Sequence, residues 1–345
     1  MSVDLVNRLK EKRTLDDAGF LSLLQCEDDS ALIEAARGVA VKRFGNGIYI
    51  RGLIEFTNYC KNDCYYCGIR KGNKRARRYR LTQEEVLYCC ARGYELGFRT
   101  FVLQGGEDPW YTVARMTALI SAIKGRYPDC ALTLSFGEHS KKTYRAYKAA
   151  GADRYLLRHE TADAAHYGKL HPAGQTITSR INALLSLKEA GFQVGTGVMV
   201  GSPYQTDETL LKDIRLFEEV RPHMLGVGPY LPHADTPFAN HAGGSLKKTV
   251  KLIAMLRLMF PNALIPATTA LATIAQNGRE QGILAGANVV MPNLSPADVR
   301  EKYMLYDGKA YAGEEAAESL SLLKNMLRNI GYEALVARGD YAEEL

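Results

Sequence analysis

The chain has 345 residues, of which 46% are hydrophobic and 24% are charged, and this composition is typical of a folded globular protein rather than a disordered or fibrous one. Lys and Arg number 44 against 38 Asp and Glu, so the formal net charge is +6. No stretch approaches the ~20 apolar residues that span a bilayer, and the charged N-terminal residues lack the apolar core of a signal peptide. We therefore expect a cytoplasmic protein with no membrane partner.

Residues 1–47 predict an N-terminal helical extension, because leucines recur at helical spacing and turn residues at 44–47 end the pattern. From residue 48 onward, short apolar runs alternate with helical patterns. This alternation is typical of parallel strands joined by right-handed crossover helices. The eight predicted strands are 49–56, 100–104, 131–136, 154–158, 193–200, 224–230, 263–268 and 288–292.

The intervening segments carry start and stop signals of helices. Thr82 and Glu85 form a capping box, and three helices are expected to end near Gly97, Gly151 and Gly191. Eight strand and helix units favour a closed (β/α)8 barrel of the TIM type, in the α/β class, over an open doubly wound sheet. We expect this barrel over residues 48–313 and a C-terminal helical tail over 314–345.

The positive charge gathers in one stretch, the basic segment 71–80. Such a segment either attracts nucleic acid or forms a solvated loop. No series of aromatic residues for base stacking accompanies it, so we expect a solvated loop and no nucleic-acid partner. Its basic residues are Lys71, Lys74, Arg75, Arg77, Arg78 and Arg80.

Seven cysteines occur, an odd number that argues against a disulfide framework and in favour of metal ligation together with buried thiols. Cys60, Cys64 and Cys67 follow the first predicted strand, where barrel enzymes carry catalytic loops. Their C-x3-C-x2-C spacing allows one short loop to bind three corners of an iron–sulfur cubane and leaves the fourth iron without a protein ligand. The other cysteines have no ligand spacing and are expected to be buried: Cys26, Cys89, Cys90 and Cys130.

A zinc site is the alternative interpretation of the three cysteines. Closed structural zinc takes four ligands, typically from two paired clusters, and no second C-x2-C or H-x3-H pair is present. The sequence therefore favours a single [4Fe-4S] cluster over zinc.

The cysteine loop and the Gln104-Gly105-Gly106-Glu107 segment after the second strand together resemble the radical S-adenosylmethionine (SAM) superfamily. The resemblance implies that the open iron binds the amino and carboxylate groups of SAM. One electron then cleaves the sulfonium to methionine and a 5'-deoxyadenosyl radical. The implied cofactors are one [4Fe-4S] cluster and SAM, and the implied electron donor is reduced ferredoxin or flavodoxin.

Matching segments extend through most of the barrel and resemble the HydE family of [FeFe]-hydrogenase maturases. They are IEFTNYCKNDCYYCGIR, LQGGEDPWY, AGADRYLLRHETAD, GVMVGSPYQT, VGPYLPHADTP, IPATTA and GANVVMPN. Biotin synthases and methylornithine synthases share the cysteine loop, but residues 158–161 and 266–269 look most like the maturases. The resemblance implies a radical reaction on a small iron–carbonyl–cyanide–cysteine precursor, with other hydrogenase maturases as partners.

Two other functions stay open. The first is a methylornithine-synthase-like or other radical enzyme acting on a small amino acid, and the second is a non-catalytic iron–sulfur or zinc scaffold. Many members of the family hold a second cluster with C-terminal cysteines, whereas this chain has no cysteine after Cys130. We expect a single cluster, which leaves the radical chemistry intact but the substrate open.

The resemblance also implies residues that bind SAM. Tyr66 packs on the adenine, Glu160 accepts hydrogen bonds from the ribose, and Arg180 pairs with the SAM carboxylate. The segment 104–107 accepts hydrogen bonds from the amino group. The implied SAM-binding residues are Tyr66, Gln104, Gly105, Gly106, Glu107, Thr133, Glu160, Arg180 and Met199.

A second set resembles the family's substrate and anion sites deeper in the barrel. Arginines inside a barrel are costly without anionic partners, so an anionic substrate is physically sensible. The implied substrate residues are Arg154, Arg158, Thr268, Thr269, Met291 and Tyr303.

Overall fold

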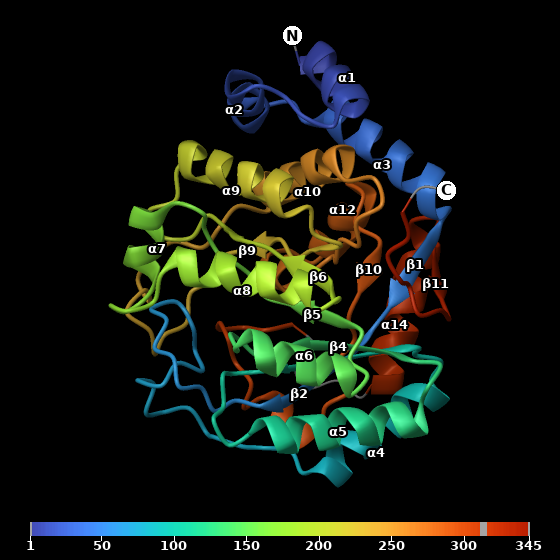
Figure 1. Ribbon diagram of the computed structural model, residues 1–345. Helices are drawn as coiled ribbons and strands as arrows, with labels where there is room; N and C mark the ends of the chain where they lie inside the picture. The colour runs from blue at the N-terminus through green and yellow to red at the C-terminus, as the bar shows by residue number, and fades with distance from the viewer. Residues whose placement is uncertain (1, 311–315, 344–345) are drawn as a thin grey trace.

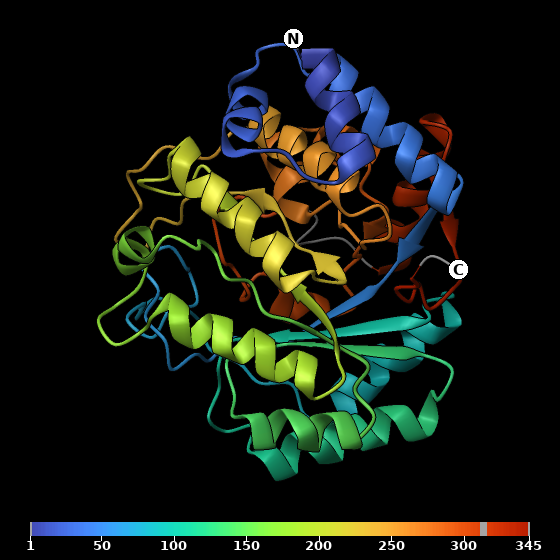
Figure 2. The same ribbon diagram turned by 45° about the horizontal axis from the view of Figure 1, so that its top comes forward.

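The computed structural model describes residues 2–310 and 316–343. Three helices come first, α1 (Ser2–Lys12), α2 (Asp17–Gln25) and α3 (Ser30–Phe44). They lie together at one end of the molecule, at the top of Figure 1, and a tilted view brings them forward over α9 (Asp207–Val220) and α10 (Leu246–Met259) (Figure 2). Contacts between α3 and α10 and between α2 and α9 fix this extension to the rest of the chain.

Parallel strands form the centre of the fold. Six of them make one continuous sheet in the order β2 (Gly52–Thr57), β3 (Thr100–Gly105), β4 (Ala131–Ser135), β5 (Arg154–Leu156), β6 (Gln193–Thr196) and β8 (Met224–Leu225). Two strand positions continue in a second short strand, because β7 (Met199–Val200) follows β6 and β9 (Gly228–Pro229) follows β8. β7 and β9 pair with each other in parallel. The predicted strands 193–200 and 224–230 are therefore each split into two pieces.

Isolated bridges close the sheet into a ring. Met224 pairs with Leu264, and Pro266 pairs with Val289 at the start of β10 (Val289–Val290). β10 then pairs with β1 (Gly47–Ile50), the first half of the predicted strand 49–56. The strand pairs that form this ring are all parallel, so the predicted (β/α)8 barrel is confirmed.

Helices cover the outside of the ring as the sequence patterns predict. Thr82 caps α4 through the predicted reciprocal bonds with Glu85, and Gly97, Gly151 and Gly191 have the positive φ expected of residues that end helices. The remaining helices are α4 (Gln83–Glu95), α5 (Val113–Arg126), α6 (Lys141–Ala149), α7 (Ala164–Leu170), α8 (Ile177–Glu189), α11 (Thr269–Ile274), α12 (Gly278–Leu284), α13 (Ala297–Arg300) and α14 (Ala316–Asn329).

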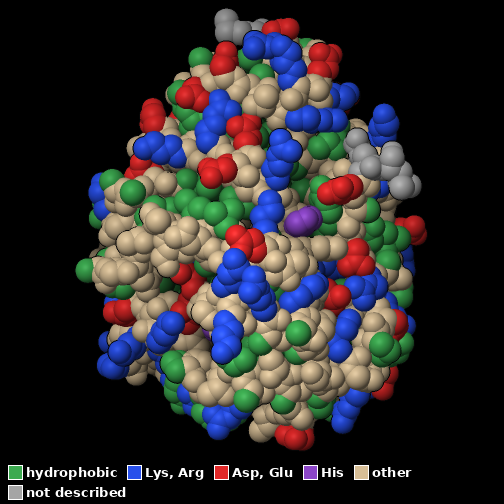
Figure 3. Space-filling view, viewed as in Figure 1, with side chains coloured by type: hydrophobic (Ala, Val, Ile, Leu, Met, Phe, Trp, Pro, Cys, Tyr) green, Lys and Arg blue, Asp and Glu red, His purple; other side chains and the backbone are tan. Residues whose placement is uncertain are grey.

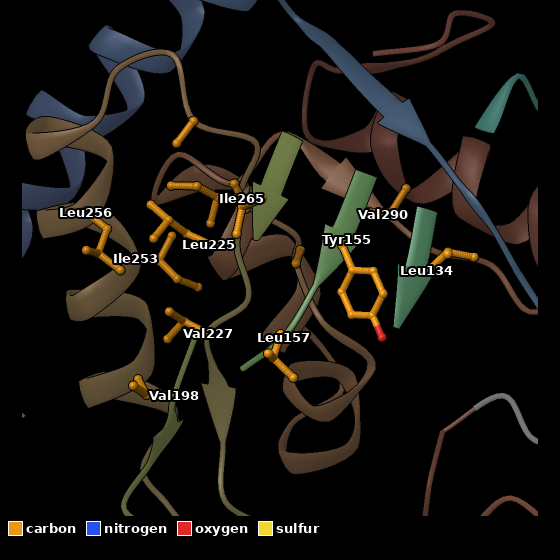
Figure 4. Close-up of a cluster of buried hydrophobic side chains, with 14 of the residues drawn as sticks. Leu134, Tyr155, Leu157, Val198, Leu225, Val227, Ile253, Leu256, Ile265 and Val290 are labelled. Atoms are coloured by element: carbon orange, nitrogen blue, oxygen red, sulfur yellow. The ribbon is translucent and has the colours of Figure 1, made fainter. Parts of the chain in front are cut away.

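The hydrophobic core lies largely between the strands and the surrounding helices. Figure 4 shows Leu225 and Ile265 of the barrel wall beside Ile253 and Leu256 of α10, and all four side chains are buried. Because successive side chains of a strand alternate between its faces, the neighbours of these residues point into the barrel. The inward positions are therefore available to polar residues of a site.

The C-terminal segment adds a strand that the sequence patterns do not predict. The tail contains the expected helix, α14, but β11 (Glu333–Leu335) follows it and pairs in parallel with the outer edge of β1. The predicted boundary between residues 313 and 314 lies outside the described residues. Within residues 2–310 and 316–343, no helix is long and apolar enough to cross a bilayer.

Arg154 requires a correction, because the C-terminal segment uses its guanidinium. Its Nη2 donates to the carbonyl oxygens of Arg338 (2.9 Å) and Gly339 (3.0 Å) and lies 2.5 Å from Asp340 Oδ1. Arg154 is fully buried at the N-terminal end of β5. The structure therefore places it at the opposite end of the barrel from the cysteine loop and not in a substrate site.

Candidate active site

The C-terminal ends of the strands surround a cavity of about 340 Å³. It collects side chains from widely separated parts of the chain, which the closed barrel brings together. Sixteen of the residues singled out in the sequence line it: Cys60, Cys64, Tyr66, Cys67, Gln104, Gly105, Gly106, Glu107, Arg158, Glu160, Arg180, Met199, Thr268, Thr269, Met291 and Tyr303.

The three cysteines of the loop face one another closely enough to interact. Burial and the neighbouring Cys60 raise the pKa of the Cys64 thiol to about 12. Burial, Cys64 and Cys60 also raise the pKa of the Cys67 thiol. Three such neighbouring thiols stay protonated unless a cationic metal centre stabilises their thiolates, so the loop is suited to hold one.

Three thiols from one short loop match the three corners of a [4Fe-4S] cluster that keeps its fourth iron open. A closed zinc site takes four protein ligands at about 2.0–2.3 Å from one ion. In residues 2–310 and 316–343, no group of three or more His, Cys, Asp or Glu side chains is placed to hold a single metal ion.

Gly106 allows the second strand's loop to approach the cysteine loop. A Cβ at this position would lie 2.3 Å from the carbonyl oxygen of Tyr59 and 2.8 Å from Cys60 Cβ. Both distances are far below van der Waals contact, so only glycine fits here. Gly106 therefore allows the Gly-Gly-Glu segment to pack directly against the proposed cluster ligand Cys60.

We expect Gly106→Ala to displace the cysteine loop and to lower both the bound iron per chain and the rate of SAM cleavage by at least about tenfold. Iron analysis after anaerobic reconstitution and quantification of 5'-deoxyadenosine measure the two effects. Gly125→Ala is the matched control, since a Cβ there meets nothing within 4 Å. Full iron content in the Gly106 variant would contradict this account of the loop.

Glu107 is held in place from two sides. Its Oε1 accepts a hydrogen bond from the backbone N of Glu138 (2.7 Å), and its Oε2 lies 3.0 Å from Lys61 Nζ. Gly137 has φ +92° and packs so closely on Glu107 that a Cβ would lie 1.8 Å from its Cγ. The carboxylate is therefore buried and oriented before any ligand arrives.

Glu160 has a left-handed backbone, with φ +64°, which is rare for a residue other than glycine. Its backbone bridges to Val198 at the next strand position, and its Oε2 accepts a hydrogen bond from Arg158 Nη2 at 2.8 Å. Beneath it, His159 Nε2 lies 3.4 Å from Asp213 Oδ1, and neither side chain is exposed to solvent. Strain of this kind is characteristic of residues that a functional site holds in one position.

Arg180 reaches the cavity from helix α8. Its Nε lies 2.5 Å from Glu138 Oε1, and its Nη1 donates to the carbonyl oxygen of Arg158. No protein partner for its Nη2 is found among the described residues. One edge of the guanidinium is thus fixed, while Nη2 is left to bind an anionic group that enters the cavity.

Tyr66 contacts His171, and the hydrogen bonds of this histidine assign its tautomer. Nδ1 lies 3.0 Å from the carbonyl oxygen of Tyr167, which can only accept, so Nδ1 carries the proton. Nε2 then accepts from the Tyr66 hydroxyl at 3.2 Å. Burial lowers the pKa of His171 to about 4, which keeps the ring neutral at physiological pH.

This shift predicts a pH dependence of stability. The pKa of His171 is lower in the folded state than the ordinary value of about 6.5, so the unfolded chain binds the extra proton and stability falls as pH drops from about 6.5 toward 4. We expect a loss on the order of 1–3 kcal/mol from this group. Urea unfolding of the apoprotein across this range measures it, and His171→Asn should flatten the slope. An unchanged slope would contradict the prediction.

Thr133 also requires a correction. It is buried on β4 but does not line the cavity, whereas Ser135, two residues further along the same face, does. Two residues of a strand span about 7 Å, enough to move a side chain by a whole layer of the barrel. At this strand end Ser135, rather than Thr133, therefore lines the cavity.

The cavity wall also contains a buried ion pair that the sequence patterns do not predict. Lys309 Nζ lies 2.5 Å from Glu55 Oε1, with side chains 9% and 1% exposed. Asn293 Nδ2 donates to the other Glu55 oxygen at 2.8 Å. Glu55 carries a detectable signal, because it is the single acidic residue within the predicted strand 49–56, which is otherwise mainly apolar; Lys309 lies in a loop and has none.

Comparisons with known proteins agree with this geometry. The family model described as the radical SAM superfamily matches residues 54–217. A curated relative is 41% identical over 94% of this chain and 90% of its own length. The chain therefore belongs to the radical SAM superfamily, whose members use a [4Fe-4S] cluster and SAM, and it is an enzyme.

That relative is the [FeFe] hydrogenase maturase subunit HydE of Thermotoga maritima, so the chain is a close homologue of HydE. A 3-methylornithine synthase of Methanosarcina barkeri is 34% identical over 84% of this chain and 81% of that protein. Among solved structures, methylornithine synthase (PylB) matches with a TM-score of 0.84 and 30% identity, covering 96% of this chain and 97% of that one. The maturase HydG matches in fold, with a TM-score of 0.78, 23% identity, and coverage of 97% and 76%.

Proposed function

We propose that this enzyme acts in assembly of the [FeFe]-hydrogenase active-site cluster. A cluster bound by Cys60, Cys64 and Cys67 supplies reductive cleavage of SAM to a 5'-deoxyadenosyl radical. The proposed substrate is a small iron–carbonyl–cyanide–cysteine precursor. The observation that carries the proposal is the single cavity in which the cysteine loop, the Gly-Gly-Glu segment, Glu160 and Arg180 meet. The identity to HydE favours the maturation role.

The proposed division of the cavity follows its chemistry. Tyr66, Glu107, Glu160, Arg180 and Met199 surround the cysteine loop and are the proposed SAM-binding residues. Their arrangement combines an apolar surface for the adenine, carboxylates for hydroxyl and amino groups, and a guanidinium for the carboxylate. A reactive radical must be kept from side reactions with bulk water, and the barrel interior is the proposed shelter.

The proposed substrate region lies on the other wall. Thr268 and Thr269 follow the seventh strand position, and Thr268 Oγ1 is buried without a hydrogen-bond partner among the described residues. Arg158 Nη2 donates to Glu160, whereas Arg158 Nε is also buried without a hydrogen-bond partner among the described residues. Polar atoms of a cavity wall that lack a protein partner are expected where a polar or anionic ligand supplies the missing hydrogen bonds.

A second candidate function is a methylornithine-synthase-like reaction on a small amino acid. The specific observation in its favour is the match to PylB over nearly the full length of both chains. An α-amino acid and a cysteine-bearing iron complex share carboxylate and amine groups, so the polar lining of the cavity suits either. The two functions differ in whether a metal complex must enter.

SAM cleavage tests the proposals directly. The reconstituted enzyme is supplied anaerobically with SAM and dithionite, and 5'-deoxyadenosine is quantified with and without a candidate substrate. We expect basal cleavage and a further rise with the iron–cysteine complex. A rise with small α-amino acids alone would favour the second candidate, and no 5'-deoxyadenosine in any mixture would identify a non-catalytic scaffold. Transfer of product to other hydrogenase maturases, in the cytoplasm, is part of the same proposal.

A further inference from the structure

The positive charge of this protein is concentrated on the part of the chain that carries the cluster ligands. Residues 61–80 contain eight Lys and Arg and one Asp, a formal charge of +7, whereas the whole chain carries +6. The remaining residues therefore carry −1 together. This stretch includes Cys64, Cys67 and the basic segment 71–80. The distribution is not that of an evenly solvated surface.

Some of these charges are used inside the protein. Arg78 Nη1 donates to the carbonyl oxygen of Ile69 (2.8 Å) and its Nη2 to that of Arg70 (2.6 Å), so Arg78 shapes the loop. Arg80 lies 2.6 Å from the buried Asp108. These two arginines are structural, and the surface charge must come from others.

The remaining cations of the basic segment face solvent. The Arg75 and Arg77 side chains are 84% and 71% exposed and reach Asp235 at 2.9 Å and Glu301 at 3.9 Å. Lys71 and Lys74 are also exposed, and no acidic partner for either is found within residues 2–310 and 316–343. Exposed ion pairs contribute little to stability, so these side chains add little to the stability of the fold.

The basic segment is fixed to the cysteine loop. The backbone N of Lys71 donates to the carbonyl oxygen of Asn62 at 2.8 Å, and that of Gly72 donates to Asp63 Oδ1 at 2.7 Å. Asn62 and Asp63 stand between the first two cysteine ligands. A protein that binds the basic segment is therefore held against the loop that carries the cluster.

The surface beside this segment is hollowed rather than convex. A depression of about 130 Å³ is lined by Asn73, Arg75 and Arg77 on one side and by His233, Asp235, Glu301 and Lys302 on the other. Figure 3 shows Lys and Arg side chains at the lower left of the molecule, where Figure 1 draws the loops that follow β2. Asp235 and Glu301 pair with Arg75 and Arg77, so the surplus positive charge of the segment lies on its exposed residues Lys71 and Lys74. A surplus of this sign suits a partner with an acidic surface.

We propose that the exposed face of the basic segment 71–80 is the docking site for an acidic one-electron carrier protein. This inference rests on the proposed function, because each SAM cleavage consumes one electron. The C5'–S bond breaks, methionine and the 5'-deoxyadenosyl radical form, and the carrier leaves oxidised by one electron. Redox partners bind through small, transient interfaces in which charge complementarity steers the encounter. A basic surface on the cluster loop meets both requirements.

The test uses the reconstituted holoenzyme and an acidic flavodoxin reduced to its hydroquinone. The variant Lys71→Glu/Lys74→Glu reverses two exposed charges that have no acidic partner, and Lys71→Arg/Lys74→Arg preserves them. The matched control is Lys10→Glu/Lys12→Glu on α1, which makes the same change of charge on the N-terminal extension. Two quantities are measured at low and high salt: the flavodoxin affinity by calorimetry and the rate of 5'-deoxyadenosine formation.

We expect the reversal variant to lower the affinity and the flavodoxin-driven rate at least about tenfold at low salt, with a smaller difference at high salt. Dithionite-driven cleavage should stay at the wild-type level, and the arginine and α1 variants should behave as wild type. An equal loss with dithionite would overturn the proposal, because the segment would then shape the cluster site itself. Equal loss in the α1 variant would also overturn it.

A nucleic acid partner gives a different pattern. Transfer RNA or duplex DNA bound by wild type and released by the reversal variant, with flavodoxin affinity unchanged, would overturn the proposal in favour of nucleic-acid binding. Failure of the proposed function is recognised separately, because the wild-type enzyme would then form no 5'-deoxyadenosine from SAM with dithionite. The flavodoxin affinity of the variants still tests the docking surface in that case.

Discussion

Cys64→Ala is expected to reduce 5'-deoxyadenosine formation by at least about a hundredfold, beyond the 10–100-fold that changes around a metal ligand cost. The reason is geometric, because the loss of one of three corner ligands exposes a second iron and the cluster no longer keeps a single open site for SAM. Anaerobic reconstitution, iron analysis and quantification of 5'-deoxyadenosine measure the result. Cleavage at the wild-type rate would contradict the assignment.

The fold should survive this substitution. Cys64 lies in a loop outside the strands, and the hydrophobic core is formed by side chains of the barrel and its helices. Circular dichroism is therefore expected to be unchanged. Cys26→Ala is the matched control, since Cys26 lies at the end of α2 and contacts the carbonyl oxygen of Asp28, away from the cavity. Loss of cleavage in this control would show a general effect of removing a thiol.

Arg154→Met is expected to lower the free energy of unfolding by about 2–4 kcal/mol. The substitution removes the donor for two backbone carbonyl oxygens and the partner of Asp340 at a fully buried position. Urea denaturation of the apoprotein measures the change. Little loss of SAM cleavage is expected at temperatures where the variant stays folded, because Arg154 is remote from the cavity.

Arg158→Met provides the contrast, four residues along the same strand face. Arg158 lines the cavity, and its side chain is 31% exposed and forms an ion pair with Glu160. We expect its unfolding free energy to change by less than about 1 kcal/mol, while substrate-dependent turnover falls. A larger stability loss for Arg158→Met than for Arg154→Met would contradict the placement of the two arginines.

These two arginines show what a linear sequence predicts well and what it does not. The alternation of a strand correctly puts residues 154, 156 and 158 on one face. It does not give the depth at which each lies, and four residues along a strand cover about 13 Å, roughly the distance from one end of the barrel to the other. Thr133 and Ser135 differ in depth for the same reason.

The elements with strong local signals were predictable. The apolar runs at 100–104 and 131–136 correspond to β3 and β4 nearly residue for residue, and the capping box at Thr82 begins α4. β11 was not predictable, because three residues acquire strand structure only by pairing with the edge of β1. Lys309 was missed in the same way: its role depends on a long-range contact with Glu55.

The site was predictable where chemistry and close spacing coincide. Three cysteines within eight residues form a pattern that few other functions share, and the glycines of the segment 104–107 leave space that the structure shows to be needed. Arg180 and Met199 come from distant segments and carry no local pattern. Their assignment came only from the resemblance to a family, and the closed barrel explains why they lie beside the cysteines.

The C-terminal segment sets the order in which this barrel can be completed during synthesis. Residues 338–340 provide the carbonyl and carboxylate partners of Arg154, and β11 covers an edge of β1. A ribosome releases these residues only after all eight strand positions have been made, since chains emerge from the N-terminus first. Residues 338–340 therefore reach Arg154 late, after its partners within the barrel, Thr100 and Gln193, have been made.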